Sequence, residues 1–196
     1  MKKYILIVFM LISASLSAQN LFFETGMNFT NYAYSNNDGD SNDNIGPGTG
    51  VYLRSGLGSI GSGRFSYGIS LNQFNATGGN GFDLYNWEVT HIGGFTQWNR
   101  YFNGDKTFGF IAAFELSTML SGKQVLGESS YNLSEYDEFK GLWASPRLGL
   151  NYQIISTNSV ILAIGYNFQV GINTTGRTSE KLSFNTHQLG IKLNIK

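Results

Sequence analysis

The chain has 196 residues, of which 13% are charged and 15% are aromatic, with 25 glycines, 2 prolines and no cysteine. Soluble domains carry about 25% charged residues, and a disordered chain has few aromatics and a high net charge, so this composition fits neither class. The lack of cysteine excludes a disulfide scaffold and a cysteine-ligated metal site, and the zero formal net charge gives no sign of a nucleic-acid partner.

Residues 1–18 have the pattern of a secretory signal peptide. Lys2 and Lys3 precede an apolar run, and small residues follow up to Ala18. The apolar run is shorter than the about 20 residues that a membrane-spanning helix needs. We therefore expect cleavage after Ala18 and one mature domain over 19–196. Without the two lysines, that domain has 11 basic and 13 acidic residues and a formal charge of −2.

The mature chain alternates between apolar and polar residues, which is the pattern of β-strands. In the clearest segment, Val160–Asn173, every even position is apolar, and the odd positions are mostly small or polar. Gly93 and Gly94 interrupt one segment and predict a bulge there. The eight predicted strands are Leu21–Tyr32, Thr49–Leu57, Arg64–Phe74, Trp87–Asn99, Phe108–Leu120, Leu142–Ile154, Val160–Asn173 and Ser183–Ile195.

The connections between these strands alternate in length. The long ones are 33–48, 75–86, 121–141 and 174–182, and the short ones are 58–63, 100–107 and 155–159. Outer-membrane barrels have short periplasmic turns and long external loops. The sequence therefore predicts that both ends of the barrel domain are periplasmic and that every long loop is external.

The less apolar strand face decides between a membrane barrel and a soluble, lipocalin-type barrel. It consists of Gly, Ser, Asn and Gln with six charged residues, which are Glu24, Arg54, Glu88, Glu115, Arg147 and Lys192. A surface in contact with water normally carries far more charge, whereas small polar residues suit the narrow lumen of an eight-stranded barrel. The apolar face is therefore predicted to meet lipid.

Aromatic residues are concentrated near the predicted strand ends, where amphipathic rings form interfacial girdles in membrane barrels. At the periplasmic ends these are Phe65, Tyr67, Trp98, Tyr101, Phe102, Phe108 and Tyr152. At the external ends they are Trp87, Phe139 and Trp143. The sequence therefore predicts two aromatic girdles around the barrel.

An isolated charge in a narrow lumen is costly, so the lumen charges are expected to form ion pairs. The candidates are Glu115, Arg147, Glu24, Lys192 and Arg54. If the fifth and sixth strands pair so that Leu120 faces Leu142, Glu115 faces Arg147 near mid-membrane.

The last strand is expected to close on the first. If Leu21 lies near Ile195, Glu24 meets Lys192, and Arg54 on the second strand lies close to that pair. Together the two clusters predict a lumen plugged by polar side chains, without a continuous water channel.

Two motifs with possible chemistry carry little weight. Gly56–Gly61 matches a dinucleotide-binding pattern, but it lies in a short turn between strands and not before a helix. The segment around Asp38, Asp40 and Asp43 resembles a calcium loop, but it lacks the required glycine and final glutamate. A solvated acidic loop is the favoured interpretation, with calcium as the alternative.

The whole mature chain resembles the small outer-membrane β-barrel proteins of Gram-negative bacteria, the OmpA/OmpX-like class. The resemblance rests on the signal peptide, eight alternating strands, loop asymmetry and a last strand ending in THQLGIKLNIK, although many members of that class end in an aromatic residue. It implies an all-β, eight-stranded antiparallel up-and-down transmembrane β-barrel. It also implies a monomer in the outer membrane, in contact with outer-membrane lipid and lipopolysaccharide.

The expected function is a non-catalytic one, either structural in the envelope or through a partner that binds the external loops. The loop residues proposed for such contacts are Asp38, Asp40, Asp43, Tyr131, Tyr136 and Glu138. The alternatives are a narrow porin-like channel for small solutes, a lipid-modifying outer-membrane enzyme and a soluble ligand-binding barrel. His91 and His187 lack the serine of the His-x-Ser pair of lipid A deacylases, so no catalytic, cofactor or metal residue is assigned.

Overall fold

The computed structural model describes residues 20–35, 41–42, 45–58, 64–79, 84–102, 107–175 and 181–195. Its strands are β1 (Leu21–Ser35), β2 (Ser41–Asn42), β3 (Ile45–Gly58), β4 (Arg64–Gln73), β5 (Ala76–Gly78), β6 (Tyr85–Tyr101), β7 (Phe108–Leu126), β8 (Ser129–Asn132), β9 (Leu142–Ser156), β10 (Val160–Asn173) and β11 (Lys181–Ile195). A short 3-10 turn, η1 (Leu133–Glu135), follows β8. Within these ranges, no helix has the length and apolar character needed to cross a membrane.

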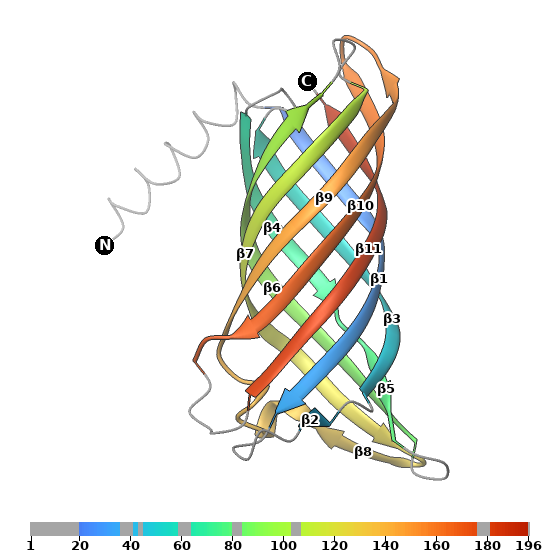
Figure 1. Ribbon diagram of the computed structural model, residues 1–196, viewed down its shortest axis with the longest axis vertical. Helices are drawn as coiled ribbons and strands as arrows, with labels where there is room; N and C mark the ends of the chain where they lie inside the picture. The colour runs from blue at the N-terminus through green and yellow to red at the C-terminus, as the bar shows by residue number, and fades with distance from the viewer. Residues whose placement is uncertain are drawn as a thin grey trace, which may run out of the picture.

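Eight long strands close into a ring, as Figure 1 shows. The order around the ring is β1-β11-β10-β9-β7-β6-β4-β3, and β3 pairs again with β1. Every neighbouring pair is antiparallel. The predicted all-β, eight-stranded antiparallel up-and-down barrel is therefore confirmed, and its eight predicted strands correspond to these eight in chain order.

The two ends of the barrel differ. Leu21 pairs with Ile195 at the end of the barrel where the short turns lie, which we call the turn end. The short strands β2, β5 and β8 and the turn η1 lie at the opposite end, which we call the loop end (Figure 1). Strand β7 reaches Leu126 and forms a hairpin with β8 there, so part of the third long connection extends the barrel wall.

The outer surface of the ring is apolar along almost its whole height. Exposed large apolar residues occur on every strand of the ring, among them Phe23, Val51, Leu53, Ile69, Leu71, Ile92, Phe114, Leu116, Leu148, Leu150, Ile164, Leu189 and Ile191. A soluble protein does not expose such a continuous apolar surface, whereas a membrane barrel turns it toward lipid. The architecture is therefore that of a transmembrane β-barrel.

The predicted bulge at Gly93 and Gly94 is wrong. These two glycines pair in register with Ser117 and Leu116 of β7. The register shifts instead beside Thr90, because β7 contains an extra residue, Leu120, between the partners of Thr90 and His91. In strand β6, the odd-numbered residues therefore face the lumen throughout the segment from Trp87 to Asn99.

Inward-facing glycines leave room for the large side chains of the lumen. Gly26, Gly190 and Gly165 lie side by side on β1, β11 and β10. A methyl group on Gly190 would overlap the hydroxyl of Tyr52, and one on Gly26 would overlap the backbone of Leu189. The glycine at position 190 therefore lets Tyr52 pack across the lumen, where its hydroxyl donates to Glu24.

Candidate functional site

The middle of the lumen is organised around Arg54, whose side chain is completely buried. Its Nη1 donates to Glu24 Oε1 at 3.1 Å, and its Nε lies 3.9 Å from Glu115 Oε2. Its Nη2 donates to Gln188 Oε1 at 2.8 Å, with longer contacts to Gln169 Oε1 at 3.3 Å and Asn72 Oδ1 at 3.4 Å. One guanidinium thus connects side chains from six of the eight ring strands, β3 included.

Secondary contacts complete this layer, which we call the charged layer. Asn72 Nδ2 donates to Glu115 Oε1 at 2.9 Å, so the second carboxylate is also held. Arg147 donates to Gln97 Oε1 at 3.1 Å. Lys192 Nζ has no hydrogen-bond partner among the described residues and lies 4.2 Å from the ring centroid of Phe22. Among the described residues, the buried charges are therefore three cations and two carboxylates, a formal surplus of one positive charge.

A second layer, nearer the loop end, consists of aromatic and aliphatic side chains. Phe184 stacks on Phe74 at 4.2 Å between ring centroids and on Trp143 at 5.5 Å. Tyr32 packs edge-on against Phe184 and against Trp87. We call the buried cluster the aromatic layer; its members are Tyr32, Ile45, Phe74, Ala76, Trp87, Val89, Leu133, Phe139, Trp143, Leu182 and Phe184.

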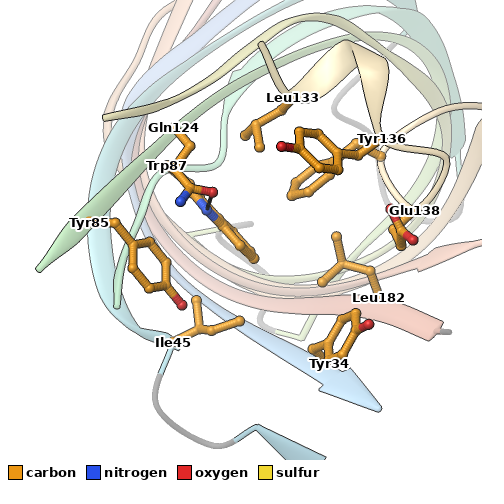
Figure 2. Close-up of a pocket in the computed structure, with 10 residues that line it drawn as sticks. Tyr34, Ile45, Tyr85, Trp87, Gln124, Leu133, Tyr136, Glu138 and Leu182 are labelled. Carbon is orange, nitrogen blue, oxygen red and sulfur yellow. Dashed lines mark hydrogen bonds between the residues drawn. The ribbon is translucent and has the colours of Figure 1, made fainter. Parts of the chain in front are cut away.

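On the loop-end side of the aromatic layer there is a cavity of about 290 Å³ (Figure 2). The rings of Tyr34, Tyr85, Trp87 and Tyr136 surround an open centre from different sides. The remaining lining residues are Ile45, Gln124, Leu133, Glu138, Phe139 and Leu182. We call this cavity the mouth pocket. Half of its lining side chains are aromatic, and the others include one carboxylate and one amide.

The loop that forms one wall of the mouth pocket is fixed to the barrel. Asn132 caps η1 by accepting from Ser134 N at 3.0 Å. Asn173 Nδ2 donates to the carbonyl oxygens of Glu138, at 2.8 Å, and Lys140, at 2.7 Å. Trp143 Nε1 donates to the Phe139 carbonyl at 3.3 Å. The wall is therefore preorganised by side chains that hold its backbone groups.

The structure places one predicted charged pair on facing positions, without an ion pair between the two side chains, and separates the other pair. Leu21 lies opposite Ile195 and Glu24 opposite Lys192, as predicted, although the ion pair of Glu24 is formed with Arg54. The predicted register of Leu120 with Leu142 is wrong. Leu142 lies opposite Thr118, Arg147 opposite Ala113 and Glu115 opposite Ser145, which is a shift of two residues. Glu115 therefore meets Arg54 and Asn72 instead of facing Arg147.

Two other predictions about the strand ends are wrong. Glu88 does not face the lumen; it is exposed at the loop end and pairs with Lys123 at 3.0 Å. Trp87, Phe139 and Trp143 do not form an external girdle, because their side chains are buried in the aromatic layer. At the turn end, Tyr101 is buried, while exposed rings do lie on the outer surface at Phe65, Tyr67, Phe102, Phe108 and Tyr152.

The proposed loop contacts fall into three groups. Tyr136 and Glu138 line the mouth pocket. Tyr131 lies on β8, opposite Gln124 of β7, and is exposed outside the pocket. Asp38, Asp40 and Asp43, and with them the calcium alternative, lie outside the described residues, as does the signal peptide at 1–18.

A histidine–serine pair was not foreseen from the sequence. His91 Nδ1 lies 3.2 Å from Ser117 Oγ, on the neighbouring strand β7. Both residues are buried, and His91 packs edge-on against Phe74 and Trp143. The inward parity that Ser117 shares with Glu115 is the signal that could have placed it in the lumen, but the cross-strand partner depends on a register that the sequence does not fix.

The solved structures similar to this chain include small outer-membrane β-barrel proteins. The outer membrane protein OprG from Pseudomonas aeruginosa is 11% identical over 91% of this chain and 96% of that chain, with a TM-score of 0.49. Neisserial surface protein A (NspA) is 14% identical over 89% and 96%, with a TM-score of 0.48. The attachment invasion locus protein Ail of Yersinia pestis is 8% identical over 89% and 98%, with a TM-score of 0.38.

No protein-family model matches the chain, and no curated protein does either. The architecture therefore rests on the chain's own geometry, which consists of eight antiparallel strands in a closed ring, an apolar outer surface and a polar interior. By these features, the chain has the fold of the small outer-membrane β-barrel proteins.

Proposed function

We propose that the protein is a non-catalytic outer-membrane barrel with a closed lumen that acts through its loop end. Residues 1–18 direct export and are removed, and the monomeric barrel is surrounded by outer-membrane lipid and lipopolysaccharide. The loop end faces the outside of the cell. The observation that carries this proposal is the pair of packed layers that cross the lumen, the charged layer around Arg54 and the aromatic layer around Phe184.

The two layers oppose conduction for different reasons. The aromatic layer is apolar and close-packed, so water entering it would lose its hydrogen bonds without replacement. The charged layer is cross-linked from six strands through Arg54 and carries a surplus positive charge. An ion would have to break several buried hydrogen bonds there, and a cation would also be repelled.

The position of His91 and Ser117 supports a non-catalytic role. A serine nucleophile needs its base within hydrogen-bond reach, and this pair meets that condition. A substrate also needs access, but rings of the aromatic layer, among them Phe74 and Trp143, pack directly on His91. We interpret the contact as a satisfied buried hydrogen bond.

The charge distribution supports a role at the loop end. The long connections and adjoining strand ends carry ten acidic and four basic residues, which gives a formal charge of −6. The acidic residues are Asp38, Asp40, Asp43, Asp83, Glu88, Glu128, Glu135, Asp137, Glu138 and Glu180, and the basic residues are Lys123, Lys140, Arg177 and Lys181. Segments with this excess of acidic residues attract cations and cationic partners, including divalent ions that bridge lipopolysaccharide.

Conductance in a planar lipid bilayer tests the closed lumen. We expect the purified protein, inserted in its heat-modifiable folded form, to give no stable current steps, while a porin inserted under the same conditions does. A large, stable conductance from the folded protein would overturn the proposal in favour of a narrow channel for small solutes.

A further inference from the structure

The walls of the mouth pocket combine aromatic rings with one carboxylate. Tyr34, Tyr85, Trp87 and Tyr136 present aromatic rings to the same space (Figure 2). The faces of such rings are negative, and Trp and Tyr attract cations most strongly. Trp87 is fixed in place by its Nε1 donating to Gln124 Oε1 at 3.1 Å and by an edge-on contact with Phe139.

Glu138 adds a formal negative charge to the mouth pocket. Its carboxylate is in the pocket lining, and no cationic side chain forms an ion pair with it among the side chains that the structure describes. The nearby cation Lys140 is bound to Asp137 at 2.7 Å instead. The formal charge of −6 on the loop-end segments raises the local concentration of cations further.

We infer that the mouth pocket binds a small organic cation of the alkylammonium class, with its ammonium group among the aromatic rings and near Glu138. A volume of about 290 Å³ is just below the range for ligand pockets, which are about 300–1,000 Å³, so the ligand is compact. An anion would be repelled by Glu138. A neutral apolar ligand would leave the carboxylate without a counter-charge and would gain nothing from the negative ring faces.

The fixed wall keeps the cost of binding low. The Asn173 side chain holds the carbonyl groups of Glu138 and Lys140, and Trp143 holds that of Phe139. Less conformational freedom is therefore lost when the ligand enters than with a mobile loop. This inference rests on the proposed function only in needing the loop end to be accessible from outside.

Calorimetric titration with choline tests the inference, and 3,3-dimethylbutan-1-ol is the matched control because it has the same shape without the charge. The folded protein should be in a maltoside detergent, which contributes no quaternary ammonium group. We expect choline to bind about tenfold more tightly than the neutral alcohol, a difference of the size that cation–π contacts and one partly exposed ion pair supply together.

Two pairs of variants distinguish binding in the mouth pocket from attraction by the general negative charge of the loop. Glu138→Gln should weaken choline binding about three- to tenfold, whereas Glu135→Gln, which makes the same charge change in the same loop outside the pocket lining, should leave it within about twofold. Tyr136→Leu should weaken it by a similar factor, and Tyr131→Leu, at an exposed tyrosine outside the pocket, should not.

The outcomes distinguish this inference from the proposed function. Equal affinity for choline and the neutral alcohol, an equal effect of the two glutamate variants or no binding of either compound would overturn the organic-cation site. If the protein does not bind choline and gives no current in a bilayer, the organic-cation site is contradicted and the closed lumen is supported. If the protein binds choline and conducts, the organic-cation site is supported and the closed lumen is contradicted.

Discussion

Replacing Arg54 by alanine is expected to lower the free energy of unfolding by about 3–5 kcal/mol, the cost of leaving a buried ion pair without one partner. The substitution removes the only cation in ion-pair contact with Glu24 and Glu115 among the described residues. It also removes the donor to Gln188 and Gln169, so several buried acceptors lose a hydrogen bond.

Urea unfolding of the refolded protein in lipid vesicles, followed by tryptophan fluorescence and by heat-modifiable gel migration, measures this loss. Arg100→Ala is the control, because Arg100 is an exposed residue on β6, and it should cost less than about 1 kcal/mol. Adding Glu24→Gln to Arg54→Ala should recover part of the loss, since one uncompensated charge disappears. A loss below about 1 kcal/mol for Arg54→Ala would show that the charged layer does not hold the barrel together.

Replacing Trp143 by alanine is expected to cost about 3–5 kcal/mol, as for other large aromatic residues in packed interiors. Trp143 is fully buried, stacks on Phe184 and contacts the ring of His91. Its indole also holds the Phe139 carbonyl, so the variant loosens the wall of the mouth pocket as well.

The same urea unfolding measures this effect, and Trp98→Ala is the matched control. Trp98 is half-buried on the outer face of β6 near the turn end, so its removal leaves no cavity in the lumen and should cost less than Trp143→Ala. Equal losses for the two variants would place Trp143 on the outer surface, as the sequence pattern of an aromatic girdle predicted, and would contradict the aromatic layer.

The strands and their two faces could be predicted from the sequence because a barrel with lipid outside and a narrow lumen inside forces strict alternation. In β10, even positions such as Ile164 and Tyr166 are exposed, and odd positions such as Asn167 and Gln169 are buried, as predicted. Parity along a single strand needs no knowledge of its neighbours, and loop length is read directly from the gaps between strands.

Register across a long loop could not be predicted in the same way. A hairpin with a two-residue turn fixes its register, whereas the 15 residues from Gly127 to Gly141 separate β7 from β9 and allow several registers. The extra residue Leu120 adds a shift on the β6 side. The predicted partner of Glu115 was therefore wrong, while Glu24 and Lys192, near the closure of the barrel, were correctly placed opposite each other.

The aromatic layer was not predicted, although the alternation of inward and outward residues along the strands already indicated it. Trp143 has the same parity as Arg147, which faces the lumen, yet its position near a strand end favoured a girdle. Glu88 was predicted to face the lumen. This would require the lumen-facing residues of β6 to change from odd to even positions at Gly93 and Gly94, and β6 shows no such change. The mouth pocket combines side chains from several loops and strands, so no single segment of sequence predicts it.

Membrane orientation tests the central claim, a spanning barrel whose loop end faces outward, most directly. The chain has no cysteine, so Ser130→Cys on β8 and Ser159→Cys in the turn between β9 and β10 each introduce a single thiol at an exposed serine. With a membrane-impermeant maleimide, we expect labelling at position 130 in intact cells, and at 159 only after the outer membrane is permeabilised. Labelling at 159 but not at 130 in intact cells would contradict this orientation and the role proposed for the loop end.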